Sequence, residues 1–345
     1  MCGLFAKILK YLVFSLLFNS QCPSYAIDIS YRKNLFVKEL IGYNADIMCL
    51  QEVDKKIYEG DLHPIFSNMK FDGLFGCKDG SAAEGTACFW NTDKFQLQES
   101  SRTILREIVQ QDDNFKDILE VLNKNEKLKE TFMDRNTISQ TVVLDSKVGN
   151  QGWYLLYPYK KSENKKNFYK FLIQNFFAGL IVGTTHLFWR PDADHIRLLQ
   201  VGIVMRILKH FAKKMSEKNP TKNYSILLCG DFNSTPPFGV LEFMRNKIID
   251  EDYRDWKSAE GEEITNFKLE HSFNMDSACG TPIYTNYTLG FKDCLDYIFY
   301  QTDSLEVKNV IPFPTEEDLS RYQAIPNQVF PSDHIACVSD LKWKN

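Results

Sequence analysis

An apolar run that ends in a short polar motif constrains the fold of this chain more than any other feature. Residues 224–228 predict a buried strand, and Asp231 and Asn233 follow it within the segment 229–236. Alternate side chains leave a strand in the same direction, so this carboxylate and amide should project together from one sheet edge. The carboxylate can orient or deprotonate a water, and the amide can donate to a phosphoryl oxygen. A capped turn is the structural alternative for the pair.

The order of strand-like and helix-like segments predicts the fold class. They alternate over the whole chain of 345 residues, which is typical of an α/β fold. Several strands alternate apolar with polar residues, which favours a layered sandwich of packed sheets over a doubly wound parallel sheet. No internal repeat or linker is visible, so one domain is expected.

Two helices are expected to bury one face each. The helix at residues 30–44 should bury Tyr31, Leu35, Phe36, Leu40 and Ile41, and the helix at 194–214 should bury Ile196, Leu199, Ile203, Ile207 and His210. A charged peripheral helical region is expected at 104–133. Strands are expected at 45–50, 85–90, 138–144, 153–157, 180–186, 297–300 and 336–338. Loops are expected at 78–81 and 160–167, and irregular structure at 251–270.

Charge and cysteine content limit the function classes. A net charge of -4 argues against a non-specific nucleic-acid binder but allows an enzyme that grips a few nucleotides. The nine cysteines are odd in number and lack zinc-site spacing. Cys49, Cys229 and Cys337 lie in apolar runs, so reduced core cysteines in a cytosolic or mitochondrial-matrix protein are expected.

The first 21 residues differ in character from the rest. Lys7 and Lys10 precede the apolar run 11–18, as in a signal peptide, yet the run is short for a membrane span. A targeting segment, a core strand and an incorrect gene start are the alternatives. Apart from this ambiguous run, no membrane association is expected.

Glu52 and His186 each follow a predicted strand. An exposed loop carboxylate is the alternative for Glu52, but beside the other motifs it predicts a Mg²⁺ ligand. A lone histidine at such a position is more often a satisfied core residue. The strand end and the neighbouring Trp189 favour a phosphate contact for His186.

Asp296 and His334 are expected to form a pair. Asp296 enters a buried strand and needs a partner, and His334 can supply one that the carboxylate would orient and stabilise in its charged form. An N-cap role is the alternative for Asp333, which precedes His334.

The loop at 285–291 carries groups suited to a nucleobase. Phe291 can stack on a base and Asn286 can contact an adenine edge, while core packing is the alternative for Tyr287. Arg135 could hold a phosphate or form a surface salt bridge, and both remain open.

Taken in order, these motifs resemble the endonuclease/exonuclease/phosphatase superfamily, in particular its CCR4/nocturnin-like branch and the 2',5'-phosphodiesterase 12 group. The segments that carry the resemblance are 43–54, 185–189, 229–236, 277–280, 284–287, 294–299 and 331–336. Gly-Asp-Phe-Asn and Ser-Asp-His identify the superfamily, whereas Ser-Ala-Cys-Gly and Thr-Asn-Tyr indicate the narrower group. The resemblance spans about residues 22–343.

The resemblance implies a four-layer α/β sandwich of the DNase I-like type, with two packed mixed sheets flanked by helices. It implies a Mg²⁺-dependent phosphodiesterase that degrades 2',5'-oligoadenylates and poly(A) tails to 5'-AMP from the 2' or 3' end. Oligoadenylate or poly(A) RNA would be the partner, with no obligate protein partner. The compartment implied is the mitochondrial matrix, with the cytoplasm as alternative.

The resemblance also assigns roles by position. The expected metal ligands are Glu52 and, for a second ion, Asp333. The expected catalytic residues are Asp231, which activates water, Asn233, which holds a phosphoryl oxygen, His334, which stabilises the transition state, Asp296, which supports it, and His186, which contacts phosphate. The expected substrate-binding residues are Asn286, Phe291, Arg135 and Trp189.

The front of the chain departs from this family. Members begin with a strand that ends in an asparagine motif, which residues 11–20 do not match, and Asn19 is only a weak substitute. The expected division is therefore an atypical segment at 1–21 and a catalytic domain at 22–345. A general CCR4-like deadenylase and an inactive adenylate-binding relative are the alternative functions.

Overall fold

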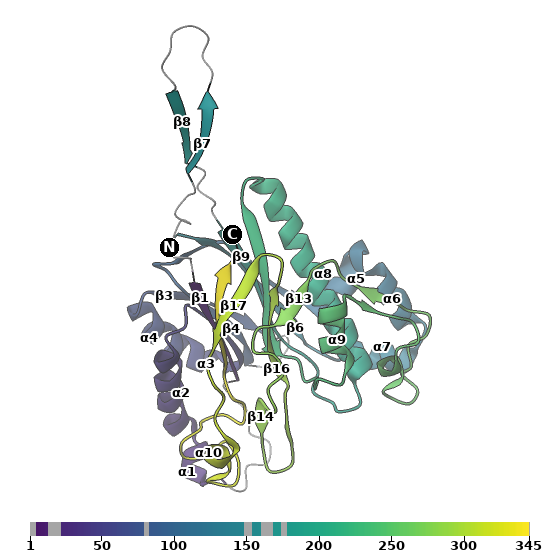
Figure 1. Ribbon diagram of the computed structural model, residues 1–345. Helices are drawn as coiled ribbons and strands as arrows, with labels where there is room; N and C mark the ends of the chain where they lie inside the picture. The colour runs from purple at the N-terminus through teal and green to yellow at the C-terminus, as the bar shows by residue number, and fades with distance from the viewer. Residues whose placement is uncertain are drawn as a thin grey trace.

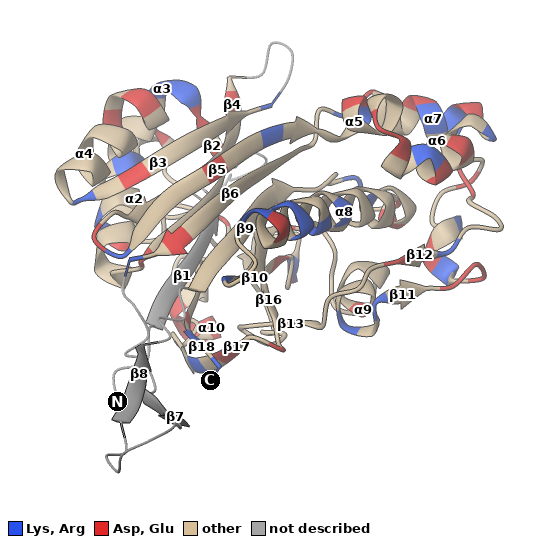
Figure 2. Ribbon diagram, turned by 90° about the horizontal axis from the view of Figure 1, so that it is seen from above, with Lys and Arg blue, Asp and Glu red and all other residues tan. Residues whose placement is uncertain are grey.

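Two β-sheets pack face to face between two layers of helices in the computed structural model (Figure 1). The structure describes residues 5–12, 22–78, 83–147, 154–159, 168–173 and 178–344, and of 5–12, 154–159 and 168–173 only the backbone. The view from above places α2–α4 beyond one sheet and α5–α9 beyond the other (Figure 2). The predicted four-layer α/β sandwich is confirmed.

Each of the two main sheets has six strands. The first has the order β17 (Leu305–Val310), β18 (Cys337–Trp343), β1 (Phe5–Leu12), β2 (Ile47–Asp54), β4 (Glu84–Asn91) and β3 (Phe71–Cys77). The second has the order β13 (Met275–Ser277), β16 (Asp296–Gln301), β10 (Asn223–Asp231), β9 (Ala178–His186), β6 (Ile138–Ser146) and β5 (Phe95–Ile104). Two-stranded pairs are β7 (Tyr154–Tyr159) with β8 (Phe168–Ile173), β11 (Ile248–Ile249) with β12 (Leu269–Glu270), and β14 (Asn286–Tyr287) with β15 (Lys292–Asp293). Both main sheets mix parallel and antiparallel neighbours.

The helices are short except for two. They are α1 (Ser24–Ile27), α2 (Ile29–Tyr43), α3 (Lys55–Ile57), α4 (His63–Asn68), α5 (Leu105–Gln111), α6 (Lys116–Asn123), α7 (Glu126–Met133), α8 (Asp194–Lys218), α9 (Gly239–Asn246) and α10 (Glu316–Ser320). The helical region predicted at 104–133 thus resolves into α5, α6 and α7.

Three apolar layers hold the sandwich together. Ile47 of the first sheet and Val142 and Ile298 of the second belong to the core between the sheets. Phe36 of α2 packs with one outer face, and Ile203 of α8 packs with the other. Because both faces of the central strands are covered, their side chains are buried along nearly their whole length.

The buried faces of α2 and α8 differ from prediction at their margins. In α2 the fully buried residues are Arg32, Phe36 and Leu40, a stripe with four-residue spacing, while Tyr31 and Ile41 are exposed. In α8 the predicted isoleucine and leucine stripe is buried, but His210 is exposed. The apolar pattern alone overlooked a buried arginine and extended the α8 stripe too far.

The N-terminal segment contributes a strand to the first sheet. The backbone of Phe5–Leu12 pairs in parallel with β2 and antiparallel with β18. This strand overlaps the apolar run 11–18 only at Tyr11 and Leu12, so the three alternatives for that run and the division at residue 21 stay predictions. Asn19, the loop predicted at 160–167 and all but Lys78 of the loop predicted at 78–81 lie outside the described residues. Among the described residues, no helix combines the length and apolarity needed to cross a bilayer.

Candidate active site

Three neighbouring strands of the second sheet bring polar side chains to one row. β9 ends at His186, β10 ends at Asp231, and β16 begins at Asp296. Asp231 is the register partner of His186 on one side and of Asp296 on the other. Residues that pair directly across a sheet project from the same face, so the three side chains share one end of the sandwich.

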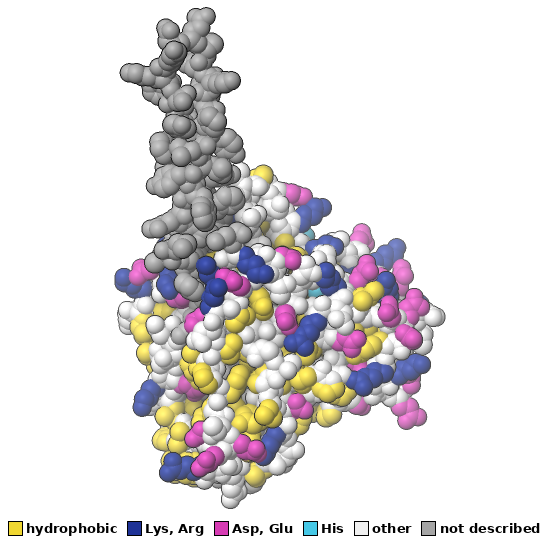
Figure 3. All heavy atoms as spheres, in the orientation of Figure 1, with side chains coloured by type: hydrophobic (Ala, Val, Ile, Leu, Met, Phe, Trp, Pro, Cys, Tyr) yellow, Lys and Arg dark blue, Asp and Glu magenta, His cyan; other side chains and the backbone are white. Residues whose placement is uncertain are grey.

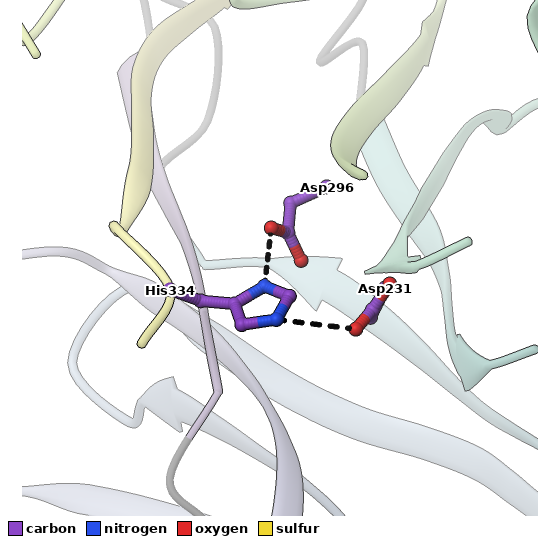
Figure 4. A group of neighbouring side chains, drawn as sticks. All are labelled: Asp231, Asp296 and His334. Atoms are coloured by element: carbon purple, nitrogen blue, oxygen red, sulfur yellow. Dashed lines mark hydrogen bonds and ion pairs between the residues drawn. The ribbon is translucent and has the colours of Figure 1, made fainter. Parts of the chain in front are cut away.

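Asp231 lies between two imidazoles. Its Oδ2 is 3.8 Å from Nε2 of His334 and 3.7 Å from Nε2 of His186. His334 Nδ1 lies 2.7 Å from Oδ2 of Asp296 (Figure 4). The Asp296 carboxylate therefore fixes the orientation of the His334 ring, which leaves Nε2 turned toward Asp231.

Glu52 approaches the same centre from the first sheet. Its Oε1 lies 3.8 Å from Nδ1 of His186. The strand was predicted to stop before Glu52, but β2 continues to Asp54 through a register irregularity between Leu50 and Val53. Glu52 has φ 51, in the left-handed region, so this bulge re-aims its side chain toward the facing sheet.

The surroundings of Glu52 disfavour its charged form. Burial, together with the carboxylates of Glu84 and Asp333, raises the pKa of Glu52 to about 8. Asp333 is itself buried, and its Oδ1 has no hydrogen-bond partner among the residues the structure describes. This end of the sandwich therefore gathers several carboxylates, and Lys78 and His334 offset their effect on the pKa of Glu52 only in part.

The turn after β10 fits both interpretations of Asp231 and Asn233, the capped turn and the pair of ligand-binding side chains. The backbone N–H of Asn233 donates to Oδ1 of Asp231 at 2.8 Å, which is the local cap. Asn233 Nδ2 donates to the carbonyl of Leu187 at 2.9 Å and anchors the turn to the segment after β9. The amide carries two N–H groups, so one bond to Leu187 leaves donor capacity for a ligand.

The β14–β15 hairpin forms the wall beside His334. Asn286 forms a β-bridge with His334, and the N–H of Tyr287 donates to the carbonyl of Asp333 at 3.1 Å. The N–H of Ile335 donates to the carbonyl of Thr285 at 2.7 Å. Asn286 thus lies beside the centre although 48 positions of the numbering separate it from His334.

The remaining predicted residues lie outside this centre. Phe291 is 43% exposed on the hairpin loop, and Trp189 is 65% exposed three residues beyond His186. Arg135 packs over the ring of Phe188, 4.6 Å from its centroid, and pairs with Asp134. The salt bridge considered for Arg135 is therefore present, and its guanidinium also rests against the residue before Trp189.

Similarity to known proteins identifies the family of this chain. The model of the Endonuclease/Exonuclease/phosphatase family matches residues 16–334. The chain belongs to this family. It is 38% identical over 323 residues to 2',5'-phosphodiesterase 12 of Homo sapiens, covering 94% of this chain and 48% of that protein. The bovine protein of that name gives the same values.

A second group of relatives consists of Ccr4 proteins. The CCR4-Not complex 3'-5'-exoribonuclease subunit Ccr4 of Schizosaccharomyces pombe is 29% identical over 350 residues, covering 93% of this chain and 46% of that protein. The chain therefore spans about half the length of the curated relatives it matches. The predicted resemblance to the CCR4-like branch and the 2',5'-phosphodiesterase 12 group is confirmed.

Solved structures share the fold. ANGEL2, described as a 2',3'-cyclic phosphatase, superposes with a TM-score of 0.73 at 18% identity, covering 99% of this chain and 96% of that one. The human nocturnin catalytic domain gives 0.59 at 18% identity, with 99% and 97% covered. At these identities the likeness supports the architecture alone.

In this member of the family, the donor set suits a hard divalent cation. Asp231, Asp296 and His334 each offer a ligand atom, and these atoms lie within 4.8 Å of one another. Glu52 and Asp333, the predicted ligands, are not in that group, but both add carboxylate oxygens to the same end of the sandwich. Such oxygens are the ligands of Mg²⁺ and Ca²⁺, and a cation would reverse the effect that raises the pKa of Glu52.

Sequence reasoning missed several supporting residues. Thr285 Oγ1 accepts from the N–H groups of Leu295 and Asp296, at 2.9 and 3.0 Å, and fixes the start of β16. Ser332 Oγ accepts from the N–H of His334 at 3.1 Å. Both hydroxyls lie inside motifs that carry the family resemblance, so their place there was the available signal.

Proposed function

We propose that this chain is a Mg²⁺-dependent phosphodiesterase that removes 5'-AMP from 2',5'-oligoadenylates and poly(A). The observation that carries the proposal is the position of Asp231 between His334 and His186, with Glu52 facing it from the other sheet. The names of the relatives, 2',5'-phosphodiesterase 12 and the Ccr4 exoribonuclease, support a phosphodiester substrate.

The proposed reaction is attack of water on phosphorus. Asp231 orients the water and accepts its proton, while the bond from phosphorus to the 2'- or 3'-oxygen breaks and that oxygen takes up a proton. His334, oriented by its bond to Asp296, donates to a phosphoryl oxygen as negative charge builds there. Mg²⁺, held by Glu52 with Asp333 nearby for a second ion, would supply further neutralisation of that charge.

The remaining residues are assigned to substrate binding. Asn233 offers its second amide N–H to the phosphoryl group, and His186 contacts the phosphate. Asn286 lies beside His334, where it can contact an adenine edge, and Phe291 offers an exposed ring for stacking. Trp189 and Arg135 are proposed to contact the remaining nucleotides of the adenylate substrate.

The proposed compartment is the mitochondrial matrix, with the cytoplasm as alternative. All eight described cysteines are free thiols, which supports a reducing compartment. Oligoadenylate or poly(A) RNA is the proposed partner.

The test of the function is release of AMP by the purified chain from a 2',5'-linked and a 3',5'-linked adenylate trimer. We expect Mg²⁺-dependent release that EDTA stops and added Mg²⁺ restores, and the ratio of the two rates gives the linkage preference. If protein that is folded by circular dichroism releases AMP from neither trimer, the proposal fails. Adenylate binding by that protein would then support the inactive relative.

Replacing Phe291 with alanine should raise KM for the adenylate trimer about tenfold and change kcat much less, because stacking on one base contributes about 1–3 kcal/mol. Steady-state kinetics on both trimers measures this. Leu289→Ala is the matched control, since Leu289 is an apolar side chain on the same loop and 54% exposed. A variant with unchanged KM and a collapsed kcat contradicts the stacking role.

A further inference from the structure

The α2 helix buries a charged residue against the segment that carries His334. Arg32 is fully buried, and its guanidinium lies over the ring of Phe36, 5.2 Å from the centroid. Its Nε donates to the carbonyl of Pro331 at 2.6 Å. Arginine is almost never fully buried without specific partners, and the bond to Pro331 is one of those that hold this charge in the interior.

The backbone of residues 331–334 connects the bond of Arg32 with the imidazole of His334. Pro331 precedes Ser332, whose hydroxyl accepts the N–H of His334, and His334 bonds Asp296. The carbonyl that Arg32 holds therefore lies at the start of the turn that presents the imidazole. A shift of this turn would move the imidazole relative to Asp231.

Tyrosines of α1 and α2 also bond Gln328, which lies three residues before Pro331. The hydroxyl of Tyr31 donates to the carbonyl of Gln328 at 2.8 Å, and that of Tyr25 donates to the Gln328 side chain at 3.1 Å. Figure 1 shows α1 and α10 together at the lower end of the molecule. In the space-filling view, apolar side chains, coloured yellow, extend from the middle of this face to that end, where acidic and basic side chains lie among them (Figure 3).

The same helix is also connected to the other half of the centre. α2 ends at Tyr43 with Asn44 in the left-handed conformation, and the chain then enters β2, which carries Glu52. Phe36 and Leu40 pack in one apolar cluster with Ala336 and Val338, which follow His334. α2 thus shares an apolar cluster with the strand that carries Glu52, and it contacts the turn that carries His334.

We propose that Arg32 is a positioning residue, which sets the orientation of His334 by fixing the carbonyl of Pro331. This inference rests on the proposed function for its kinetic test, but its structural test does not. Lysine cannot replace it fully, because an ammonium lacks the planar, inflexible arrangement of donors that a guanidinium offers. Misplacement of a catalytic group by about 1 Å can cost about 10²-fold in rate.

The experiment compares Arg32→Lys and Arg32→Met with the full chain. In both we expect kcat for AMP release to fall about 10- to 100-fold, with KM within about threefold. In protein with ¹⁵N-labelled histidine, we expect the downfield proton signal of His334 Nδ1 to shift or broaden. That signal, assigned by its loss in His334→Gln, reports the bond to Asp296 whether or not the protein hydrolyses adenylates.

Arg106→Met is the matched control, because Arg106 Nη1 donates to the carbonyl of Met133 at 3.2 Å near α5 and α7. It should lower the melting temperature and leave kcat and the His334 signal unchanged. Wild-type kcat and an unaltered signal in Arg32→Met would overturn the inference. If Arg32→Met does not fold, Arg32→Lys decides by the same two measurements. A wild-type chain without hydrolysis refutes the proposed function, and the His334 signal still tests Arg32.

Discussion

Replacing His334 with alanine is expected to lower kcat for AMP release about 10³-fold and to leave KM nearly unchanged. The imidazole is buried between Asp296 and Asp231, where a preorganised hydrogen-bond donor stabilises the transition state far more than the bound substrate. Removal of one such donor typically costs about 10²–10³ in kcat, and the loss of its Asp296 pair adds to that. Initial rates over a range of adenylate trimer concentrations measure the change.

The control for this variant is His210→Ala, which removes an exposed imidazole from α8. Its rate should equal that of the wild type. His334→Ala also leaves the Asp296 carboxylate buried without its imidazole, so a lower melting temperature is expected, and rates are compared well below it. More than a tenth of the wild-type kcat in folded His334→Ala would contradict the assigned mechanism.

Asp231→Asn is expected to lower kcat about 10²–10⁴-fold while the fold stays intact. An asparagine at this position keeps an oxygen that can accept the N–H of Asn233, so the turn after β10 is preserved. It loses the negative charge that accepts a proton from water, and general-base catalysis contributes about 10²–10⁴ in rate. Single-turnover AMP release, together with circular dichroism and thermal unfolding, measures both expectations.

Asp192→Asn is the matched control, because Asp192 is an exposed aspartate near the same end of β9 and pairs with Arg190. It should retain full activity. A folded Asp231→Asn variant with a rate within tenfold of wild type would assign the water to another group, such as His186, which lies 3.7 Å from Asp231.

The row of His186, Asp231 and Asp296 was accessible to sequence reasoning because each residue adjoins an apolar strand. Once the three strands are neighbours, the hydrogen-bond register alone brings the side chains together. The pairing of Asp296 with His334 could be anticipated because a buried carboxylate needs a partner. The roles of these residues stay predictions.

Other features could not be predicted from local pattern. Glu52 lies in a bulge with positive φ, and a one-residue irregularity leaves no mark in the apolar run before it. Arg32 was not among the residues predicted for the buried face of α2, because charged residues usually face water, although it shares the four-residue spacing of Phe36 and Leu40. His210 continued the apolar stripe of α8 beyond the part that neighbouring elements cover.

The first sheet pairs a strand that is made early in synthesis with one that is made late. Its interior strand β1 pairs with β18, and the register sets Phe5 opposite Lys342. The second sheet draws its strands from the stretch between β5 and β16, within the interior of the chain. During synthesis, the strands that carry His186, Asp231 and Asp296 are therefore all made before β18, so their row can assemble before the first sheet is complete. The sheet that carries Glu52 is complete only once β18 has been made, so Glu52 reaches its final surroundings after the opposite row has formed.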